Sequence, residues 1–133
     1  MTMAERSYPD PTTNLETERY WAAAKDGQLL IKTCNACGEA HYYPREICPH
    51  CGSTDTEWRE ASGKGVIYSY SVMRRAEIPY VIAYVTLAEG VTMMTNIVDS
   101  EFDAIAIGKA VEVTFRETEG GMALPVFRLV DGG

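Results

Sequence analysis

The sequence predicts a mainly β protein built in three consecutive parts: an N-terminal helix, a small cysteine-bearing ribbon and a five-stranded β-barrel of the OB type. Three observations predict this order. A segment rich in helix-forming residues comes first, two closely spaced cysteine pairs follow, and alternating apolar and polar residues fill the second half. We place the boundaries at residues 1–27, 28–58 and 59–133.

The composition is typical of a soluble globular protein with an acidic balance. Of the 133 residues, 46% are hydrophobic and 23% are charged, and the net charge is −7. Apolar runs such as Tyr80–Val85 are too short to span a membrane, and Met1–Asp10 lacks the apolar core of a secretory signal. We therefore expect a cytoplasmic protein, and general binding to nucleic acid is disfavoured because it needs a surplus of Lys and Arg.

The first structured element is predicted to be a helix from Leu15 to Asp26. Thr13 and Glu16 fit a capping box at its start, and Gly27 suits its C-terminal end. Residues 1–12, broken by prolines, are expected to form a loose arm. The apolar side of the helix consists of Leu15, Tyr20, Trp21 and Ala24.

The β residues follow the helix in a set of short segments. Residues 28–33 and 55–61 look extended and flank the cysteine pairs. Five longer strands are predicted at residues 66–73, 80–87, 91–98, 110–117 and 124–130. With one long connection, residues 99–109, between the third and fourth of these, they suit a five-stranded Greek-key barrel of the OB type. A small open β-sandwich is the alternative.

The four cysteines of the chain form two Cys-x-x-Cys pairs, each followed by glycine: Cys34, Cys37, Cys48 and Cys51. Four thiolates at this spacing can surround one zinc ion in a tetrahedron with Zn–S distances of ~2.3 Å. The glycine after each pair accepts the positive φ of a sharp turn while backbone N–H groups point at sulfur. The sequence therefore predicts a rubredoxin-like zinc ribbon. Its metal is structural, because four thiolates leave no open coordination position.

Spacing alone leaves two other uses of these cysteines open. A redox pair would not need a twin, whereas a rubredoxin-like iron site uses the same four ligands and is harder to exclude. The only histidines, His41 and His50, lie in or beside the ribbon. Each is more typical of a surface residue there than of a catalytic base.

The remaining sequence offers no independent catalytic set. Once the cysteines bind metal, no thiol remains as a nucleophile, and neither GxSxG nor HExxH occurs. Gly63-Lys64-Gly65 is too short for a P-loop, and Glu101 and Asp103 are typical of a solvated connection. We expect the chain to bind, bridge or shape a site whose chemistry another chain supplies.

Several motifs surround the cysteine pairs in a fixed order. The most specific are Tyr43-Pro44-Arg45, Ser62-Gly63-Lys64-Gly65, Leu87-Ala88-Glu89-Gly90 and Ile107-Gly108-Lys109. With the helix, the cysteines and Trp58, this order resembles the acyl-CoA-associated zinc-ribbon and OB-fold family, the domain of unknown function numbered thirty-five. The resemblance covers residues 13–130.

The resemblance implies an accessory subunit. Members of that family accompany thiolase-superfamily enzymes, namely thiolases, ketoacyl-CoA synthases, C-acyltransferases and retro-aldol lyases, and the enzyme chain carries the catalytic residues. The small chain docks beside it and helps to shape the passage of the acyl-CoA. We therefore expect structural zinc as cofactor, a thiolase-like partner in a hetero-oligomer, and acyl-CoA as a shared ligand.

Candidate contacts to acyl-CoA follow from charge, since no short motif carries them. Arg74 and Arg75 are adjacent cations between two strands, and Arg45 lies in the ribbon hairpin. Guanidinium groups suit the phosphates of CoA, although ordinary surface ion pairing is the alternative reading.

Aromatic residues suggest where partners bind. Tyr20 and Trp21 of the helix and Tyr42-Tyr43 of the ribbon either anchor the partner or, for the helix pair, cover the chain's own barrel. A nucleic-acid-binding OB module is the alternative function. Four tyrosines could stack on bases, but the charge around them is wrong: Tyr68, Tyr70, Tyr80 and Tyr84.

Overall fold

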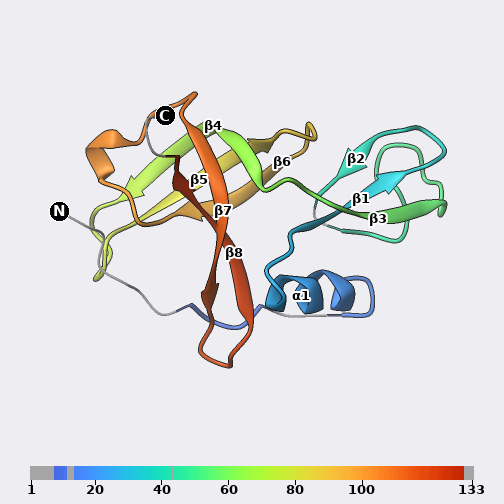
Figure 1. The fold of residues 1–133 in the computed structure, drawn as a ribbon, viewed down its shortest axis with the longest axis horizontal. Coiled ribbons are helices and arrows are strands. Elements are labelled where there is room, and N and C mark those ends of the chain that lie inside the picture. The colour runs from blue at the N-terminus through green and yellow to red at the C-terminus, as the bar shows by residue number, and fades with distance from the viewer. Residues whose placement is uncertain (1–7, 12–13, 43, 131–133) are drawn as a thin grey trace.

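The computed structural model describes residues 8–11, 14–42 and 44–130. A β-barrel occupies one side of the molecule and a small three-stranded sheet the other, with helix α1 (Glu18–Lys25) beside both (Figure 1). The predicted mainly β architecture is confirmed. Within the described part of the chain, no helix is long and apolar enough to cross a membrane.

Five strands close into a barrel in the order β4-β5-β6-β8-β7. Their bounds are β4 (Lys64–Met73), β5 (Tyr80–Leu87), β6 (Thr92–Ile97), β7 (Ala110–Glu117) and β8 (Ala123–Leu129). Neighbours run antiparallel except β6 and β8, which pair in parallel at Ile97 and Phe127. Closure confirms the five-stranded barrel and excludes the open sandwich.

The barrel interior is filled by aliphatic and aromatic side chains that are at most 1% exposed, among them Ile67, Val81, Val85, Val111 and Phe127. The strands supply these residues at alternate positions, as the sequence pattern predicted. A β-bulge between Ile67 and Ser69 interrupts the pairing of β4 with β5, and on β8 three consecutive residues are buried: Pro125, Val126 and Phe127. The bulge leaves Tyr68 without a partner position on β5. Its side chain is 67% exposed, on the side of β4 opposite to the buried Ile67.

The small sheet has the order β2-β1-β3 and is antiparallel throughout. Its strands are β1 (Leu30–Cys34), β2 (Ala40–His41) and β3 (Thr56–Glu60). Lys32 on β1 is 7% exposed, and its ammonium lies 4.5 Å from the centre of the Trp58 ring. Trp58 therefore has a structural function, covering a buried cation by a cation–π contact. The predicted boundary at residue 58 falls inside β3.

Helix α1 begins later than predicted, and a different residue pair stabilises its start. The N–H of Thr17 donates to Oδ1 of Asn14, and the N–H of Asn14 donates to Oγ1 of Thr17, both at 3.1 Å. This reciprocal pair is a capping box shifted by one residue. The carboxylate of Glu16, which was predicted to reach back to Thr13, accepts the N–H of Glu46 at 2.8 Å. Thr13 lies outside the described residues.

The aromatic side of α1 packs inside the molecule. Tyr20 is 1% exposed and Trp21 is 9% exposed, and the hydroxyls of Tyr20 and Tyr42 are 2.8 Å apart. Both residues belong to the hydrophobic core cluster, as the alternative expectation held, and Trp21 also lines a pocket at the surface. Together with the Glu16–Glu46 bond, this packing joins α1 to the ribbon, while the other contacts of α1 reach β8. Tyr43 lies outside the described residues.

Residues 8–11 do not form the loose arm that was expected. Tyr8 is 6% exposed, and its carbonyl accepts the N–H of Glu119 at 2.9 Å. The carboxylate of Asp10 accepts the hydroxyl of Thr118 at 2.5 Å and the N–H of Gly120 at 2.9 Å. These bonds tie the start of the chain to the turn between β7 and β8, a pairing too distant in sequence to predict.

Candidate metal centre

The two cysteine pairs come from two separate loops that meet at the same end of the ribbon sheet. Cys34 ends β1 and Cys37 lies in the turn after it, while Cys48 and Cys51 lie in the loop before β3. Their four sulfur atoms all lie within 4.8 Å of one another. Cys34 and Cys51 are 3.6 Å apart at sulfur, and Cys37 and Cys48 are 3.7 Å apart.

These sulfur–sulfur distances distinguish a metal site from disulfides. A disulfide needs sulfurs at about 2.05 Å. A tetrahedron with Zn–S arms of ~2.3 Å has S–S edges of ~3.8 Å, close to the separations observed. The four cysteines therefore have the arrangement of a tetrahedral thiolate site for one ion. Such a site is coordinatively closed.

The two knuckles have the same backbone geometry. The N–H of Gly38 donates to the carbonyl of Cys34 at 2.9 Å, and the N–H of Gly52 donates to that of Cys48 at 2.8 Å. Both glycines have positive φ, 77° and 80°, as predicted, which favours a residue without Cβ. The N–H of His50 lies 3.4 Å from the sulfur of Cys48, so the turn also supplies a donor to a ligand atom.

The pKa values of the thiols show why this cluster suits a cation. The backbone N–H of Cys37, with other donors, lowers the pKa of Cys34 to about 7. At Cys37 the N–H of Glu39 acts in the same direction, but desolvation and the three neighbouring thiols outweigh it and raise the pKa to about 12. Four thiolates this close repel one another, so full ionisation needs a bound cation at their centre.

The histidines of the ribbon have different environments. His50 is exposed, as expected, but His41 is only 4% exposed, so the surface expectation for His41 is wrong. The N–H of Arg45 donates to Nε2 of His41 at 3.2 Å. Burial, the main cause, lowers the pKa of His41, which keeps the ring neutral and able to accept this bond at neutral pH. His41 thus stabilises the loop between β2 and the second knuckle.

The arginines predicted to meet CoA phosphates are not brought together. Arg45 lies in the ribbon, whereas Arg74 and Arg75 lie in the connection between β4 and β5, at the opposite end of the molecule in Figure 1. All three are exposed. The guanidinium of Arg74 lies 5.6 Å from the centre of the Phe102 ring. One phosphate group can therefore contact either Arg45 or the Arg74–Arg75 pair.

The motifs between ribbon and barrel have a structural explanation. The N–H of Ser62 donates to the carboxylate of Glu89 at 2.8 Å, and this bond joins the two motifs. A Cβ on Gly65 would lie 2.6 Å from the carbonyl oxygen of Thr86, so only glycine fits where β4 crosses β5. These residues form the junction between ribbon and barrel: Gly63 lies in the bend before β4, and Lys64 and Gly65 begin the strand.

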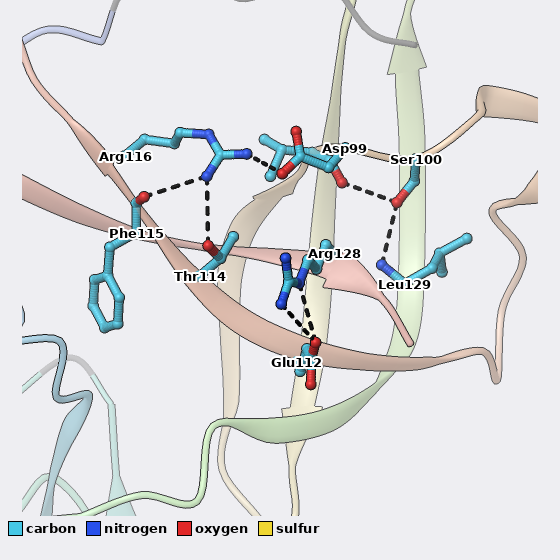
Figure 2. Close-up of polar contacts among 9 residues, drawn as sticks. Asp99, Ser100, Glu112, Thr114, Phe115, Arg116, Arg128 and Leu129 are labelled. Carbon is cyan, nitrogen blue, oxygen red and sulfur yellow. Dashed lines mark hydrogen bonds and ion pairs between the residues drawn. The ribbon is translucent and has the colours of Figure 1, made fainter. Parts of the chain in front are cut away.

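Sequence reasoning missed an ion-pair cluster on β7 and β8. Figure 2 shows Arg116 reaching Asp99, and Arg128 reaching Glu112 at 3.0 Å. The hydroxyl of Ser100, which is 7% exposed, accepts the N–H of Leu129 at 3.2 Å. The pairs join residues 16 or 17 apart in sequence, so no local motif marks them. These ion pairs make this part of the barrel's outer surface charged.

Two protein-family models match the chain, one over the ribbon and one over most of the barrel. Residues 21–57 match the family model described as the ChsH2 rubredoxin-like zinc ribbon domain, and residues 58–116 match the ChsH2 C-terminal OB-fold domain. In the structure of an Ltp2-ChsH2(DUF35) aldolase, a chain with 39% sequence identity aligns with a TM-score of 0.79, covering 90% of this chain and 98% of that one.

Three relatives have informative names. A DUF35 domain-containing scaffold protein of Methanocaldococcus jannaschii is 40% identical over 74% of this chain and 75% of its own length. A probable enoyl-CoA hydratase alpha subunit of Thermomonospora curvata is 40% identical over 90% of this chain, which spans only 39% of that longer protein. The benzoylsuccinyl-CoA thiolase subunit BbsA of Geobacter metallireducens is 31% identical, over 68% of this chain and 65% of its own.

Proposed function

Because the chain belongs to the DUF35 family of zinc-ribbon and OB-fold scaffold proteins, we propose that it is a non-catalytic accessory subunit of a thiolase-superfamily complex that processes acyl-CoA. The metal centre carries this proposal. All four cysteines of the chain meet in one coordinatively closed cluster. No thiol is then left to attack an acyl group, so a cysteine nucleophile of the thiolase type must come from another chain.

The relatives support the same reading. Their names describe a scaffold, a thiolase subunit and a hydratase subunit, two of them acting on CoA esters. The similar solved chain belongs to an aldolase whose name joins two proteins. The hydratase relative is much longer than this chain, so hydration is not part of the proposal.

The metal that we propose is zinc, with a structural function. The ribbon has strands of only 2 to 5 residues, too little to fold on a core of its own. Cys34, Cys37, Cys48 and Cys51 would hold the ion and fix the two knuckles. A cytoplasmic location, where thiols stay reduced, suits this set of ligands.

We also propose that the chain and its partner bind acyl-CoA together. Arg74 and Arg75 are the stronger candidates for its phosphates, because two adjacent exposed guanidinium groups can meet one phosphate group. Arg45 can serve only a separate contact. Replacing Arg74 and Arg75 with Gln should raise the KM for acyl-CoA of the complex while leaving assembly intact.

The test uses the chain co-expressed with a thiolase-superfamily protein from the same organism. The two should co-purify, and acyl-CoA thiolysis and retro-aldol cleavage should be measured for each chain alone and for the complex. We expect no turnover by the isolated chain and turnover by the complex. Turnover of an acyl-CoA by partner-free chain would refute the non-catalytic assignment, and the absence of any complex would refute the accessory one.

A further inference from the structure

The outer surface of the barrel divides into two unlike halves. Strands β7 and β8 carry the ion pairs of Figure 2, including Glu112 with Arg128. Strands β4, β5 and β6, which are described in full, contain one charged residue, Lys64, although 23% of the whole chain is charged. The solvent-exposed face of a sheet normally carries charged and polar residues. The near absence of charged residues from β4, β5 and β6 therefore needs another explanation.

The bare half carries large apolar side chains instead. Of the nine exposed large hydrophobic residues in the described part of the chain, six belong to these three strands. Exposed fractions are 67% for Tyr68, 61% for Met94, 47% for Tyr84 and 44% for Val66. We call Val66, Tyr68, Ile82, Tyr84 and Met94 the uncharged face.

The strand register makes the uncharged face continuous. Tyr84 on β5 is paired with Met94 on β6 and with Ser69 on β4. The bulge places the extra residue Tyr68 next to Ser69, so that Tyr68, Tyr84 and Met94 form one row across the sheet. Tyr68 lies on the same side of β4 as Val66, while Ile67 between them is buried.

A pocket extends the uncharged face toward the rest of the molecule. Its volume is about 290 Å³, and Ile82 and Met94 line it together with Trp21 of α1, Tyr42 of the ribbon and Pro125 of β8. Pockets for whole small molecules measure roughly 300–1,000 Å³. This pocket is at or below that range, a size suited to large side chains inserted by a partner. Every part of the fold contributes to its wall.

Two kinds of occupant do not fit the uncharged face. The barrel is closed, so these strands offer no free edge for an added strand. Single-stranded nucleic acid would need cations beside the stacking aromatics, and Lys64 is the one cation on the three strands. A charge-free patch rich in Tyr and Met is the composition of a protein–protein interface core.

We propose that the enzyme subunit of the complex docks on the uncharged face and inserts apolar side chains into the adjoining pocket. This inference rests on the proposed function, which supplies the partner. The partner's matching patch must itself lack charge, because a charge buried against Tyr84 and Met94 would lose its hydration without gaining a counter-ion. The charged residues that give the chain its net charge of −7 lie outside this face, so docking here does not bury them.

The test is the double variant Tyr84→Glu with Met94→Glu, with affinity for the co-purifying thiolase-type subunit measured by calorimetry. Both side chains are exposed, so metal content and melting temperature should stay at wild-type values. Interface anchors commonly cost tenfold or more each, and we expect at least about 100-fold weaker binding. The matched control is Leu15→Glu with Ile47→Glu, at positions 84% and 57% exposed outside the barrel, where affinity should change less than about 3-fold.

Each outcome decides the question. Failure of the wild-type chain to bind the subunit would refute the proposed function and this inference with it. Binding by the wild type and by the Tyr84/Met94 variant alike would refute the surface alone, as would selective loss in the Leu15/Ile47 control. Sedimentation could instead show that the wild type is a dimer and that the Tyr84/Met94 variant is a monomer that still binds the partner. In that case the face joins two copies of this chain, and the proposal is refuted.

If the Glu variant folds poorly, two variants that add no charge replace it. Tyr84→Ser and Met94→Ser should each weaken binding about 10-fold.

Discussion

The ribbon and the barrel are stabilised by different means although both are antiparallel β structures. The barrel has strands of 6 to 10 residues, a closed hydrogen-bond ladder and a core of buried Val, Ile and Phe. The ribbon has strands of 2 to 5 residues, and its turns converge on four sulfur atoms. The comparison shows that a small sheet of short strands can hold a defined structure when a bound metal takes the place of a hydrophobic core.

The ribbon and the barrel are joined through α1 and a junction, and buried residues of all three form one hydrophobic cluster. Tyr20 of α1 bonds to Tyr42 of the ribbon, Glu16 bonds to Glu46, and Ser62 bonds to Glu89 at the junction. The pocket beside the uncharged face uses residues of α1, the ribbon and the barrel. Its shape therefore depends on the metal even though no cysteine lines it.

Loss of a metal ligand should have the largest effect and should separate the two parts. Apparent binding free energies of structural zinc are about 10–16 kcal/mol, so Cys48→Ser should unfold the ribbon while the barrel keeps its slowly exchanging amides. Metal analysis of protein purified without added zinc, together with hydrogen exchange, measures both effects. The exposed His50→Ala, between the same cysteines, should retain the metal. Iron with a thiolate charge-transfer colour in protein from the native host would contradict the zinc assignment.

A cavity in the barrel should destabilise through the core instead. Phe127 is 0% exposed, and Phe127→Ala should lower the free energy of unfolding by about 3–5 kcal/mol. Urea unfolding of the metal-loaded protein measures this change, with metal content checked in the native baseline. Tyr68→Ala, which removes an exposed ring, should change stability by less than about 0.5 kcal/mol. Equal losses in both variants would show that the barrel core does not dominate barrel stability.

The contact between the parts should have a smaller effect. Tyr20→Phe keeps the ring in the core and removes the hydroxyl that lies 2.8 Å from that of Tyr42. We expect a loss of about 1 kcal/mol, the usual net value of one hydrogen bond. Thermal melting gives the loss, and faster amide exchange in the ribbon than in the barrel would locate it. Tyr84→Phe, on the barrel surface, serves as the control and should leave both quantities unchanged.

The smallest effect should come from Asp10 and should depend on pH. The hydroxyl of Thr118, and then the N–H of Gly120, hold the pKa of Asp10 below its usual 3.8. Because the folded pKa is lowered, the ionised carboxylate stabilises the fold above the unfolded pKa, and this contribution disappears as pH falls through the folded value. Asp10→Asn should be less stable than wild type at pH 7, with the gap closing toward pH 3. Melting temperatures across this range provide the test, with Glu119→Gln as the control; a gap that widens on acidification would contradict the assignment.

Several site and contact predictions from the sequence were right where the signal was local. Gly38 and Gly52 adopt the positive φ that their place after each cysteine pair predicted. Others failed where a distant residue decided the outcome. Asn14 and Thr17 form a reciprocal pair that was not predicted, and Glu16 accepts a bond from Glu46, thirty residues away. His41 is buried, and its ring accepts a hydrogen bond from the loop that follows β2. Residues 8–11 are held by hydrogen bonds to the turn between β7 and β8.

The sequence by itself determined the metal ribbon, the five strands and the family, because cysteine spacing, strand alternation and turn motifs act over a few residues. Only the tertiary structure decided which surfaces the protein presents. The pairing of β4, β5 and β6 places Tyr68, Tyr84 and Met94 side by side in the uncharged face, and the same fold separates Arg45 from Arg74 and Arg75. Register and closure are set by contacts between distant strands, and a shift of one residue would have turned Tyr84 inward.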